Sequence, residues 1–278
     1  MYGLLSQLQN NHTVLDLGCG KGSFHYDSFP FQTIAADVQL PPDVVAARRH
    51  RTQYVVSDSS AIPLTGASVD AVIAHNTLEH FADYRQTLVE VQRVLKPHGW
   101  LWIAVPNGYG FDDKLYRYVF EGGGHVNRFT REALISQVET LTSLRLVAAC
   151  DLFSSFIFLR KPTPEEAAGY PRRAHFLAGI SPEFLSTTVV ALNTATRLVD
   201  KYTGSRWSQY GWGLVFAANG SLSSEQLPSY FNVCRKCGSG FSRMHLPEST
   251  KSFFGIRPYH CPGCNEFNLF VDPPAGLD

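Results

Sequence analysis

Several features that define other protein classes are missing from this chain of 278 residues. It has no uninterrupted apolar run of the ~18 to 20 residues that a membrane-spanning helix requires, because the stretches 144–159 and 184–199 are short or broken by polar residues. No charged segment followed by an apolar core opens the chain, so no secretory signal is predicted and the cytoplasm is expected. A hydrophobic content of 44% excludes a disordered or fibrous chain.

The sequence also lacks an excess of charge of either sign. Its 24 Lys and Arg balance its 24 Asp and Glu, which removes the global attraction that most nucleic-acid-binding proteins use. Nucleic acid is therefore disfavoured as a partner. Cysteine is scarce as well, with six residues, and without an export signal clustered cysteines indicate metal ligands rather than disulfides.

Short apolar runs alternate with helical patterns from Thr13 to about Leu146, which is typical of βα units feeding a parallel sheet. The expected strands are 13–17, 33–36, 54–57, 71–74, 100–105 and 145–149. This alternation predicts an α/β fold with a doubly wound sheet.

Two helices of this region have clear sequence signals. Apolar residues recur at helical spacing from Tyr84 to Leu95, and Pro97 and Gly99 are expected to end that helix. Thr130 is the expected N-cap of the second helix.

The composition changes after the sixth expected strand. Prolines punctuate residues 155–210, which end in an amphipathic pattern and precede a last strand at 213–217. We expect a helical insertion there, although an ordinary connecting helix explains the pattern equally well. A polar linker follows, so the chain is expected to divide into a domain of residues 1–225 and a small domain of residues 231–278.

The first expected strand runs directly into a Gly-x-Gly-x-Gly loop formed by Gly18, Gly20 and Gly22. Glycines at this spacing let the chain turn sharply and let its backbone approach a ligand. Asp16 lies just before the loop, where it can fix the loop by hydrogen bonds or contact the ligand directly. A tight turn without a ligand is the alternative.

Carboxylates also end the next two strands. Asp37 lies 17 residues beyond Gly20, where a carboxylate accepts both hydroxyls of a ribose. Asp58 and Ser59 close the third strand, where a carboxylate and a backbone amide can bind an adenine. Solvated carboxylates at strand ends are the alternative.

Six sequence motifs occur in order and together resemble class I S-adenosylmethionine-dependent methyltransferases. They are Asp16–Gly22, Asp37, Ser57–Leu64, Ser68–Val72, Thr77–Phe81 and Arg93–Gly99. Within this class the chain is most similar to the type-11 and type-23 groups, which include the quinone-pathway O-methyltransferases. The resemblance covers about residues 10 to 150 and implies a Rossmann-like, seven-stranded sheet with S-adenosylmethionine as cofactor.

The resemblance also assigns roles to individual residues. It implies that the loop passes the methionine part of the cofactor, that Asp37 binds its ribose, and that Asp58 and Ser59 bind its adenine. His75 and Asn76 are implied to line the sulfonium end. A nicotinamide-binding loop is less compatible, because the third glycine of its motif would fall on Ser23.

Methyl transfer from a sulfonium requires mainly alignment, and a base is needed only when the acceptor must lose a proton. For a hydroxyl acceptor the candidate catalytic residues are His80, by its family position, and His125, on a glycine-rich loop. The quinone-pathway relatives hold a metal with a Glu-x-x-Glu-His set, whose first carboxylate is replaced here by Asn76. No catalytic metal is therefore predicted.

The C-terminal region contains two C-x-x-C pairs separated by 23 residues, Cys234 with Cys237 and Cys261 with Cys264. Four thiolates at this spacing predict a tetrahedral structural Zn²⁺ site in a zinc ribbon. From residue 231 onward the net charge is only +1, so the aromatic residues of this region are expected to form its core rather than to stack RNA bases. A docking surface for a protein partner is a further possibility.

These features together predict an S-adenosylmethionine-dependent methyltransferase that acts on a small-molecule acceptor at oxygen. Two alternatives stay open. One is an RNA methyltransferase that binds its substrate through the zinc ribbon, and the other is a protein that binds the cofactor but has lost the chemistry.

Overall fold

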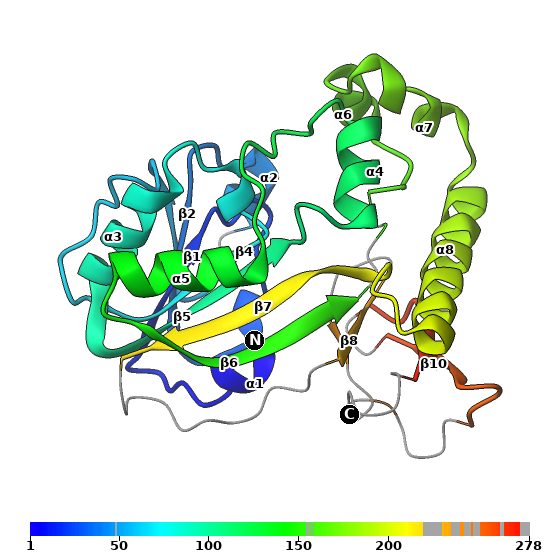
Figure 1. Cartoon of the computed structure of the whole chain (residues 1–278). Helices are drawn as coiled ribbons and strands as arrows, with labels where there is room; N and C mark the ends of the chain where they lie inside the picture. Colours follow the sequence, from blue (N-terminus) through cyan, green and yellow to red (C-terminus); the bar gives the residue numbers. More distant parts are fainter. Residues whose placement is uncertain are drawn as a thin grey trace. The chain divides into compact units, whose positions relative to one another are not determined.

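The computed structural model of this chain describes residues 1–47, 49–153, 156, 158–218, 230–234, 240–241, 246, 251–261 and 264–272. Contacts between residues divide the chain into two compact units. Unit 1 comprises Met1–Val105, Val126–Ala149 and Trp212–Gln226, and unit 2 comprises Pro106–His125, Cys150–Gly211 and Leu227–Asp278. Figure 1 shows the helices and strands of both units.

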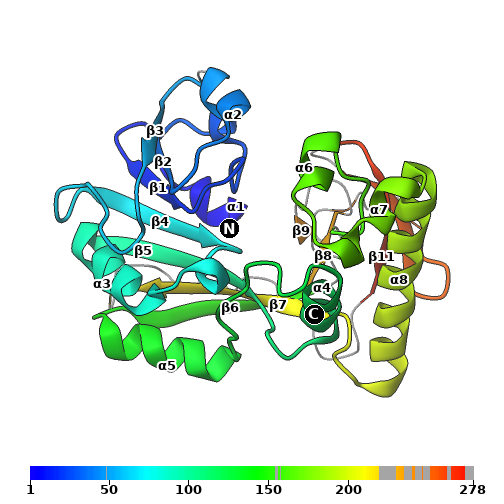
Figure 2. The same cartoon turned by 90° about the horizontal axis from the view of Figure 1, so that it is seen from above.

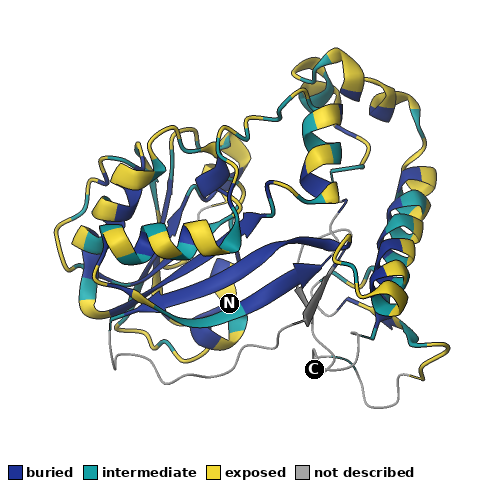
Figure 3. Ribbon diagram, viewed as in Figure 1, coloured by how far each residue is buried: buried dark blue, intermediate teal, exposed yellow. Residues whose placement is uncertain are grey.

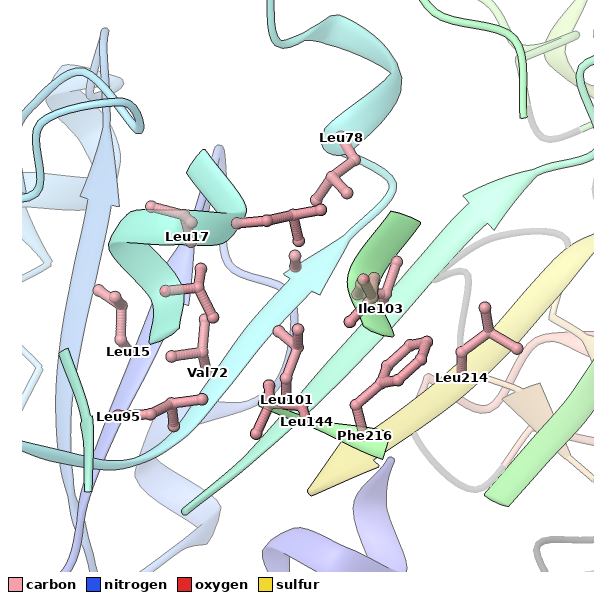
Figure 4. Close-up of a cluster of buried hydrophobic side chains, with 14 of the residues drawn as sticks. Leu15, Leu17, Val72, Leu78, Leu95, Leu101, Ile103, Leu144, Leu214 and Phe216 are labelled. Atoms are coloured by element: carbon pink, nitrogen blue, oxygen red, sulfur yellow. The ribbon is translucent and has the colours of Figure 1, made fainter. Parts of the chain in front are cut away.

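Unit 1 is built on a mixed sheet with the strand order β3-β2-β1-β4-β5-β7-β6. The strands are β1 Thr13–Leu17, β2 Gln32–Asp37, β3 Thr52–Val56, β4 Val69–His75, β5 Leu95–Pro106, β6 Arg145–Phe153 and β7 Gln209–Ala217, of which β6 and β7 continue into unit 2. The strands β1 to β5 pair in parallel, whereas β7 runs opposite to β4 and β5 (Figure 4). This order confirms the expected Rossmann-like, seven-stranded sheet.

Helices and 3₁₀ turns connect these strands. They are α1 Tyr2–Leu5, η1 Tyr26–Ser28, α2 Pro42–Ala46, η2 Leu78–His80, α3 Tyr84–Val94 and α5 Arg131–Leu141. Helices α3 and α5 pack side by side on one face of the sheet (Figure 2). Thr130 caps α5 as predicted, since its hydroxyl accepts a hydrogen bond from the amide of Ala133 at 3.2 Å.

Helix α3 ends earlier than the sequence pattern indicated. Its last residue is Val94, and Leu95 is already extended and begins β5. The reason is local, because the residue before Pro97 is sterically restricted to extended backbone and the chain must leave the helix upstream of it.

The core of unit 1 lies between the sheet and the helices α3 and α5. Fully buried side chains from three adjacent strands form its centre: Leu15 on β1, Val72 on β4, and Leu101 and Ile103 on β5 (Figure 4). The central strands β1, β4 and β7 are buried along most of their length, as the dark blue of β7 in Figure 3 illustrates, whereas α3 and α5 are each buried along one stripe only. A sheet buried in this way fixes the ends of its strands, where the candidate residues lie.

Unit 2 contains the segments between β6 and β7 together with α4 and the C-terminal strands. Its helical elements are α4 Phe111–Val119, α6 Pro164–Ala168, η3 Arg172–Ala174, α7 Phe176–Gly179 and α8 Pro182–Thr203. Its further strands are β8 Tyr230–Val233, β9 Gly240–Phe241, β10 Ile256–His260 and β11 Phe267–Val271. The strand β8 pairs in parallel with the end of β6, and β10 pairs antiparallel with β11.

The C-terminal region was expected to be a domain of its own, but by contacts it groups with the insertion. The helix α8 contacts β11, and Phe153 at the end of β6 belongs to one buried cluster with Cys234, Cys261 and Phe270. The domain boundaries at residues 225 and 231 stay a prediction. Among the described residues no single helix is long and apolar enough to cross a membrane. One bent pair of helices, Arg172–Gly179 with Pro182–Thr203, has the length and composition of a broken membrane span.

Candidate functional site

Asp16 fastens the glycine loop that follows β1. Its side chain is fully buried, and its two carboxylate oxygens accept hydrogen bonds from the Ser23 amide at 2.9 Å, the Ser23 hydroxyl at 2.6 Å and the Tyr26 hydroxyl at 2.5 Å. Burial raises the pKa of Asp16, and these hydrogen bonds oppose that shift. Of the two roles considered for Asp16, the geometry supports fixing the loop.

Two of the glycines are required for different reasons. Gly18 has φ +68°, and a Cβ there would lie 1.9 Å from the hydroxyl oxygen of Thr77, so the loop can pass the end of β4 only without a side chain. Gly20 has φ +48°, and no heavy atom of the described residues lies within 4 Å of the position its Cβ would take. The backbone around Gly20 therefore has open space beside it, as a cofactor would need.

Asp37 links the end of β2 to this loop. One of its carboxylate oxygens accepts a hydrogen bond from the Gly20 amide at 2.8 Å, and the other accepts one from the Gln39 amide at 3.1 Å. A carboxylate offers about four acceptor positions, so this half-buried group can still accept hydroxyl donors from a ligand.

Asp58 and Ser59 follow β3 but point in different directions. Asp58 is exposed, and its Oδ1 accepts from the amide and the hydroxyl of Ser60, both at 2.8 Å. These bonds hold the pKa of Asp58 below its usual range. The hydroxyl of Ser59 is buried against that of Thr87 at 2.9 Å, so only the backbone of Ser59 can meet a ligand.

The turn after β4 carries the next candidates. Nδ1 of His75 accepts a hydrogen bond from the Trp102 indole at 3.4 Å, and withdrawal from water lowers the pKa of His75 to about 4, so this ring is neutral at pH 7. Asn76 is exposed and adopts a left-handed conformation with φ +51°, which asparagine tolerates better than most residues. His80 is exposed at the end of η2.

Asn127, which the sequence patterns did not single out, holds this turn in place. Its side-chain amide donates to the carbonyl oxygens of Leu78 at 3.0 Å and Phe81 at 2.7 Å, and its backbone amide donates to that of Glu79 at 3.0 Å. Three hydrogen bonds from one residue fix the backbone on which His80 lies.

In unit 2, His125 is held by a buried carboxylate. Its Nδ1 lies 2.7 Å from Oδ1 of Asp113, whose side chain is 0% exposed, and the guanidinium of Arg117 donates to Oδ2 of Asp113 at 2.5 Å. Burial opposes ionisation of Asp113, but the hydrogen bonds from His125 and Arg117 hold its pKa below the usual range. The Arg117 guanidinium also donates to the carbonyl oxygen of His125.

The glycine-rich loop before His125 is packed closely on α4. The ring of Tyr116 lies 4.5 Å from that of His125, and its hydroxyl donates to the carbonyl oxygen of Gly123 at 3.1 Å. A Cβ at Gly123 would lie 2.2 Å from the Tyr116 ring. This loop is thus tied to α4 by Tyr116 and Arg117.

Three of the four predicted metal ligands come together in unit 2. The sulfur atoms of Cys234, Cys261 and Cys264 lie within 4.8 Å of one another, and those of Cys234 and Cys264 are 3.7 Å apart. Cys237 lies outside the described residues. The side-chain amide of Asn268, which is 5% exposed, donates to the Cys234 sulfur at 3.4 Å.

The two cysteines outside the C-x-x-C pairs, Cys19 and Cys150, are buried. Burial, with the charges of Asp16 and Asp37 adding to it, raises the pKa of Cys19 to about 12, so its thiol stays protonated and is no nucleophile.

The aromatic residues of the C-terminal region divide between core and surface. Tyr259 is 5% exposed and lies in the cluster around the cysteines, and Arg257 is paired with Asp272 at 2.8 Å. Phe253 and Phe254 remain exposed.

Comparison with known proteins shows what part of unit 1 is similar to. Residues 15–103 match a family model described as a methyltransferase domain. The match spans the glycine loop, Asp37, Asp58 and the turn after β4, and therefore contains most of the candidate residues.

Individual relatives that are similar to this region are also named as methyltransferases. A probable S-adenosylmethionine-dependent methyltransferase of Mycobacterium tuberculosis is 32% identical over 153 residues, which are 50% of this chain and 51% of that protein. The malonyl-[acyl-carrier protein] O-methyltransferase of Yersinia pestis is 30% identical over 133 residues, 45% of this chain and 49% of that protein. The chain thus spans about half the length of these relatives.

A solved structure shares the fold of the methyltransferase domain. The S-adenosylmethionine-dependent methyltransferase of Archaeoglobus fulgidus superposes with a TM-score of 0.51 at 15% identity, covering 78% of this chain and 89% of that one. The similarity confirms the fold that the sequence motifs implied.

Proposed function

We propose that this chain transfers the methyl group of S-adenosylmethionine to an oxygen atom of a small-molecule acceptor. One observation carries the proposal: the Gly20 amide donates a hydrogen bond to Asp37, and the space beside Gly20 is open. Both residues lie at the carboxyl ends of β1 and β2, where ligands bind in open α/β sheets. The oxygen acceptor is supported by the name of the Yersinia pestis relative, an O-methyltransferase.

The residues present fit the cofactor. Asp37 accepts the two ribose hydroxyls, Asp58 and the backbone of Ser59 bind the adenine, and the loop of Gly18, Gly20 and Gly22 follows the methionine part. His75 and Asn76 line the sulfonium end, where a neutral His75 adds no charge that would repel a cation. Asp16 contributes through the loop it fastens.

When bound, the cofactor supplies a methyl group on an activated leaving group, so the protein has to align the acceptor and remove its proton. We propose His125 as the base and His80 as a second acceptor-side residue. In the tautomer in which Nδ1–H of His125 donates to Asp113, Nε2 is the nitrogen that accepts a proton, and the resulting imidazolium is stabilised by the buried carboxylate. His80 lies on the turn that Asn127 fixes.

We also propose that Cys234, Cys237, Cys261 and Cys264 hold a structural Zn²⁺. The geometry fits this ion, because two sulfur atoms bound tetrahedrally to zinc at about 2.3 Å lie about 3.8 Å apart. The observed 3.7 Å between Cys234 and Cys264 is close to that value and too long for a disulfide. The Asn268 amide that donates to Cys234 is the kind of outer partner that stabilises a thiolate ligand.

Isothermal titration calorimetry with S-adenosylmethionine tests the central proposal. We expect the intact chain to bind, and Asp37→Ala to weaken binding by about 1.5 to 3 kcal/mol, because charged hydrogen bonds to the ribose are lost. Asp43→Ala, an exposed carboxylate on α2, is the matched control and should bind as the parent does. No binding by the intact chain would sink the proposal.

A second assay separates an enzyme from a protein that only binds the cofactor. Formation of S-adenosylhomocysteine is measured with a panel of hydroxyl, carboxyl and amine acceptors. Turnover only with oxygen acceptors supports the proposed chemistry, and cofactor binding without turnover on any acceptor counts against it.

A further inference from the structure

Two hydrogen bonds to neighbouring residues of β11 connect the proposed metal site to the insertion helix α8. Cys234 directly follows β8, and its sulfur accepts from the side-chain amide of Asn268 on β11. The next residue, Leu269, accepts at its carbonyl oxygen a hydrogen bond of 3.0 Å from the guanidinium of Arg197 on α8. A cysteine ligand is thus connected to α8 through two adjacent residues of β11.

The two halves of α8 are anchored differently. In its N-terminal half, Leu185 lies in an apolar cluster with Val119, Ala174 and Leu177. In its C-terminal half, the buried residues are polar: Asn193, Thr196, Arg197 and Asp200. An isolated helix is marginal in water, and most helical stability in proteins comes from packing. The C-terminal half is held by the bond of Arg197 to β11 and by Asp200, whose carboxylate accepts hydrogen bonds from Ser205, Trp207 and Ser208.

The strand β11 contributes to the buried cluster around the cysteines. Among the described residues, this cluster comprises Phe153, Cys234, Tyr259, Cys261 and Phe270. A small domain of this kind usually needs a staple such as a metal to hold its fold. Close packing at Gly255 adds a second link, because a Cβ there would lie 2.0 Å from the ammonium nitrogen of Lys201 at the end of α8.

We propose that the four-cysteine metal site stabilises the C-terminal half of α8 as well as the ribbon, so that zinc occupancy controls the protection of residues 193–203. Arg197 is the positioning residue that transmits this effect through Leu269. The inference rests on the proposed zinc site, but it concerns a different property of the chain, namely which parts of unit 2 fold with the metal.

The experiment is hydrogen–deuterium exchange of the full chain, read by mass spectrometry before and after zinc removal with EDTA, with zinc content measured in parallel. We expect exchange to accelerate about tenfold or more in peptides from β10, β11 and residues 193–203. Peptides from β1 and β4 should keep their protection, and binding of S-adenosylmethionine should persist. Unchanged protection of residues 193–203, when β10 and β11 have lost theirs, would overturn the inference while leaving the zinc site intact.

A variant identifies the connection itself. Arg197→Met keeps the length of the side chain but removes the donor to Leu269, so residues 193–203 should exchange faster with zinc still bound, and zinc removal should then add little. Arg160→Met, which breaks an exposed pair with Glu166 in the same unit, is the matched control and should retain the full dependence on zinc. Equal behaviour of the two variants contradicts the role of Arg197. Absence of zinc from the purified parent would instead refute the metal site on which the inference rests.

Discussion

The two units of this chain organise their polar groups in opposite ways. In unit 1 the candidate residues lie at strand ends, and much of the chemistry is offered by backbone amides such as that of Gly20. In unit 2 the candidate residues are side chains held by other side chains, as His125 is held by Asp113 and Cys234 by Asn268. The difference teaches that unit 1 presents its candidate site mainly through strand ends and backbone amides, whereas unit 2 relies on side chains held by other side chains.

This contrast has an energetic basis. The central strands of unit 1, such as β4 and β7, are buried on both faces, so a lost polar contact leaves a large apolar core intact. The cluster around the cysteines, which among the described residues has five buried members, includes two of the proposed ligands, so the loss of one ligand should weaken it strongly. Substitutions in the two units should therefore differ in how far their effects spread.

The largest effect is expected from Cys261→Ser. Removing one of four thiolates should abolish zinc binding and unfold the ribbon, since structural zinc sites supply folding free energy directly. Zinc content by mass spectrometry and limited proteolysis of unit 2 are the measurements, and cofactor binding by unit 1 should remain. Cys150→Ala, at a buried cysteine outside the cluster, is the control that should keep its zinc. A zinc-loaded Cys261→Ser protein would show that Cys261 is not a ligand.

The same contrast explains how much could be predicted from the sequence. The glycine loop and Asp37 were predicted because a strand, a turn and the next strand lie within 25 residues, and the parallel register of β1 and β2 brings their ends together. The surroundings of Asp16 were predicted only in part, because the sequence spacing does not indicate that the Tyr26 hydroxyl donates a hydrogen bond to the Asp16 carboxylate.

The contacts that sequence reasoning missed mostly join residues far apart in the chain. Asn127 reaches Leu78 across 49 positions, and Arg197 reaches Leu269 across 72 positions, so neither pair produces a periodic pattern. Asp113 and Arg117 are different, because an acidic and a basic residue four positions apart on a helix are a readable ion-pair signal. That signal could have identified the partner of His125.

A smaller effect, confined to unit 1, is expected from Asp16→Ala. It removes the acceptor of three hydrogen bonds and leaves the buried Tyr26 hydroxyl without this partner, which should lower the free energy of unfolding by about 2 to 4 kcal/mol. Denaturant unfolding, followed by hydrogen–deuterium exchange in peptides from β1, measures this loss of free energy of unfolding. Tyr26→Phe, which removes only one of the three bonds, should cost less, and Asp27→Asn, an exposed neighbour, should cost almost nothing. Equal costs for all three variants would refute the role given to Asp16.

Asn268→Leu tests the outer partner of the metal site. Removing the amide that donates to the Cys234 sulfur should weaken zinc affinity about 10- to 100-fold, as is typical of such partners. Competition with a chromophoric zinc chelator gives the affinity. Asn265→Gly, at a neighbouring position with φ +56° that glycine tolerates, keeps the hydrogen bond from its backbone amide to the Cys261 carbonyl oxygen and is the control. An unchanged affinity in Asn268→Leu would remove Asn268 from the metal site.

The smallest effect is a pH dependence of the loop that ends at His125. Because the folded-state pKa of Asp113 lies below its ordinary value of 3.8, its ionisation stabilises the fold fully above that value, and this contribution is lost as the pH falls through the lowered pKa. Below pH 3.8 the loop should therefore loosen, seen as a change in the nuclear magnetic resonance signals of the Tyr116 ring packed against His125. Asp113→Asn should abolish this transition, because the amide cannot ionise, and Glu165→Gln on the exposed surface of α6 should leave it in place. A transition that persists in Asp113→Asn would mean that another carboxylate controls the loop, and the pairing with Asp113 would then no longer explain how His125 is held.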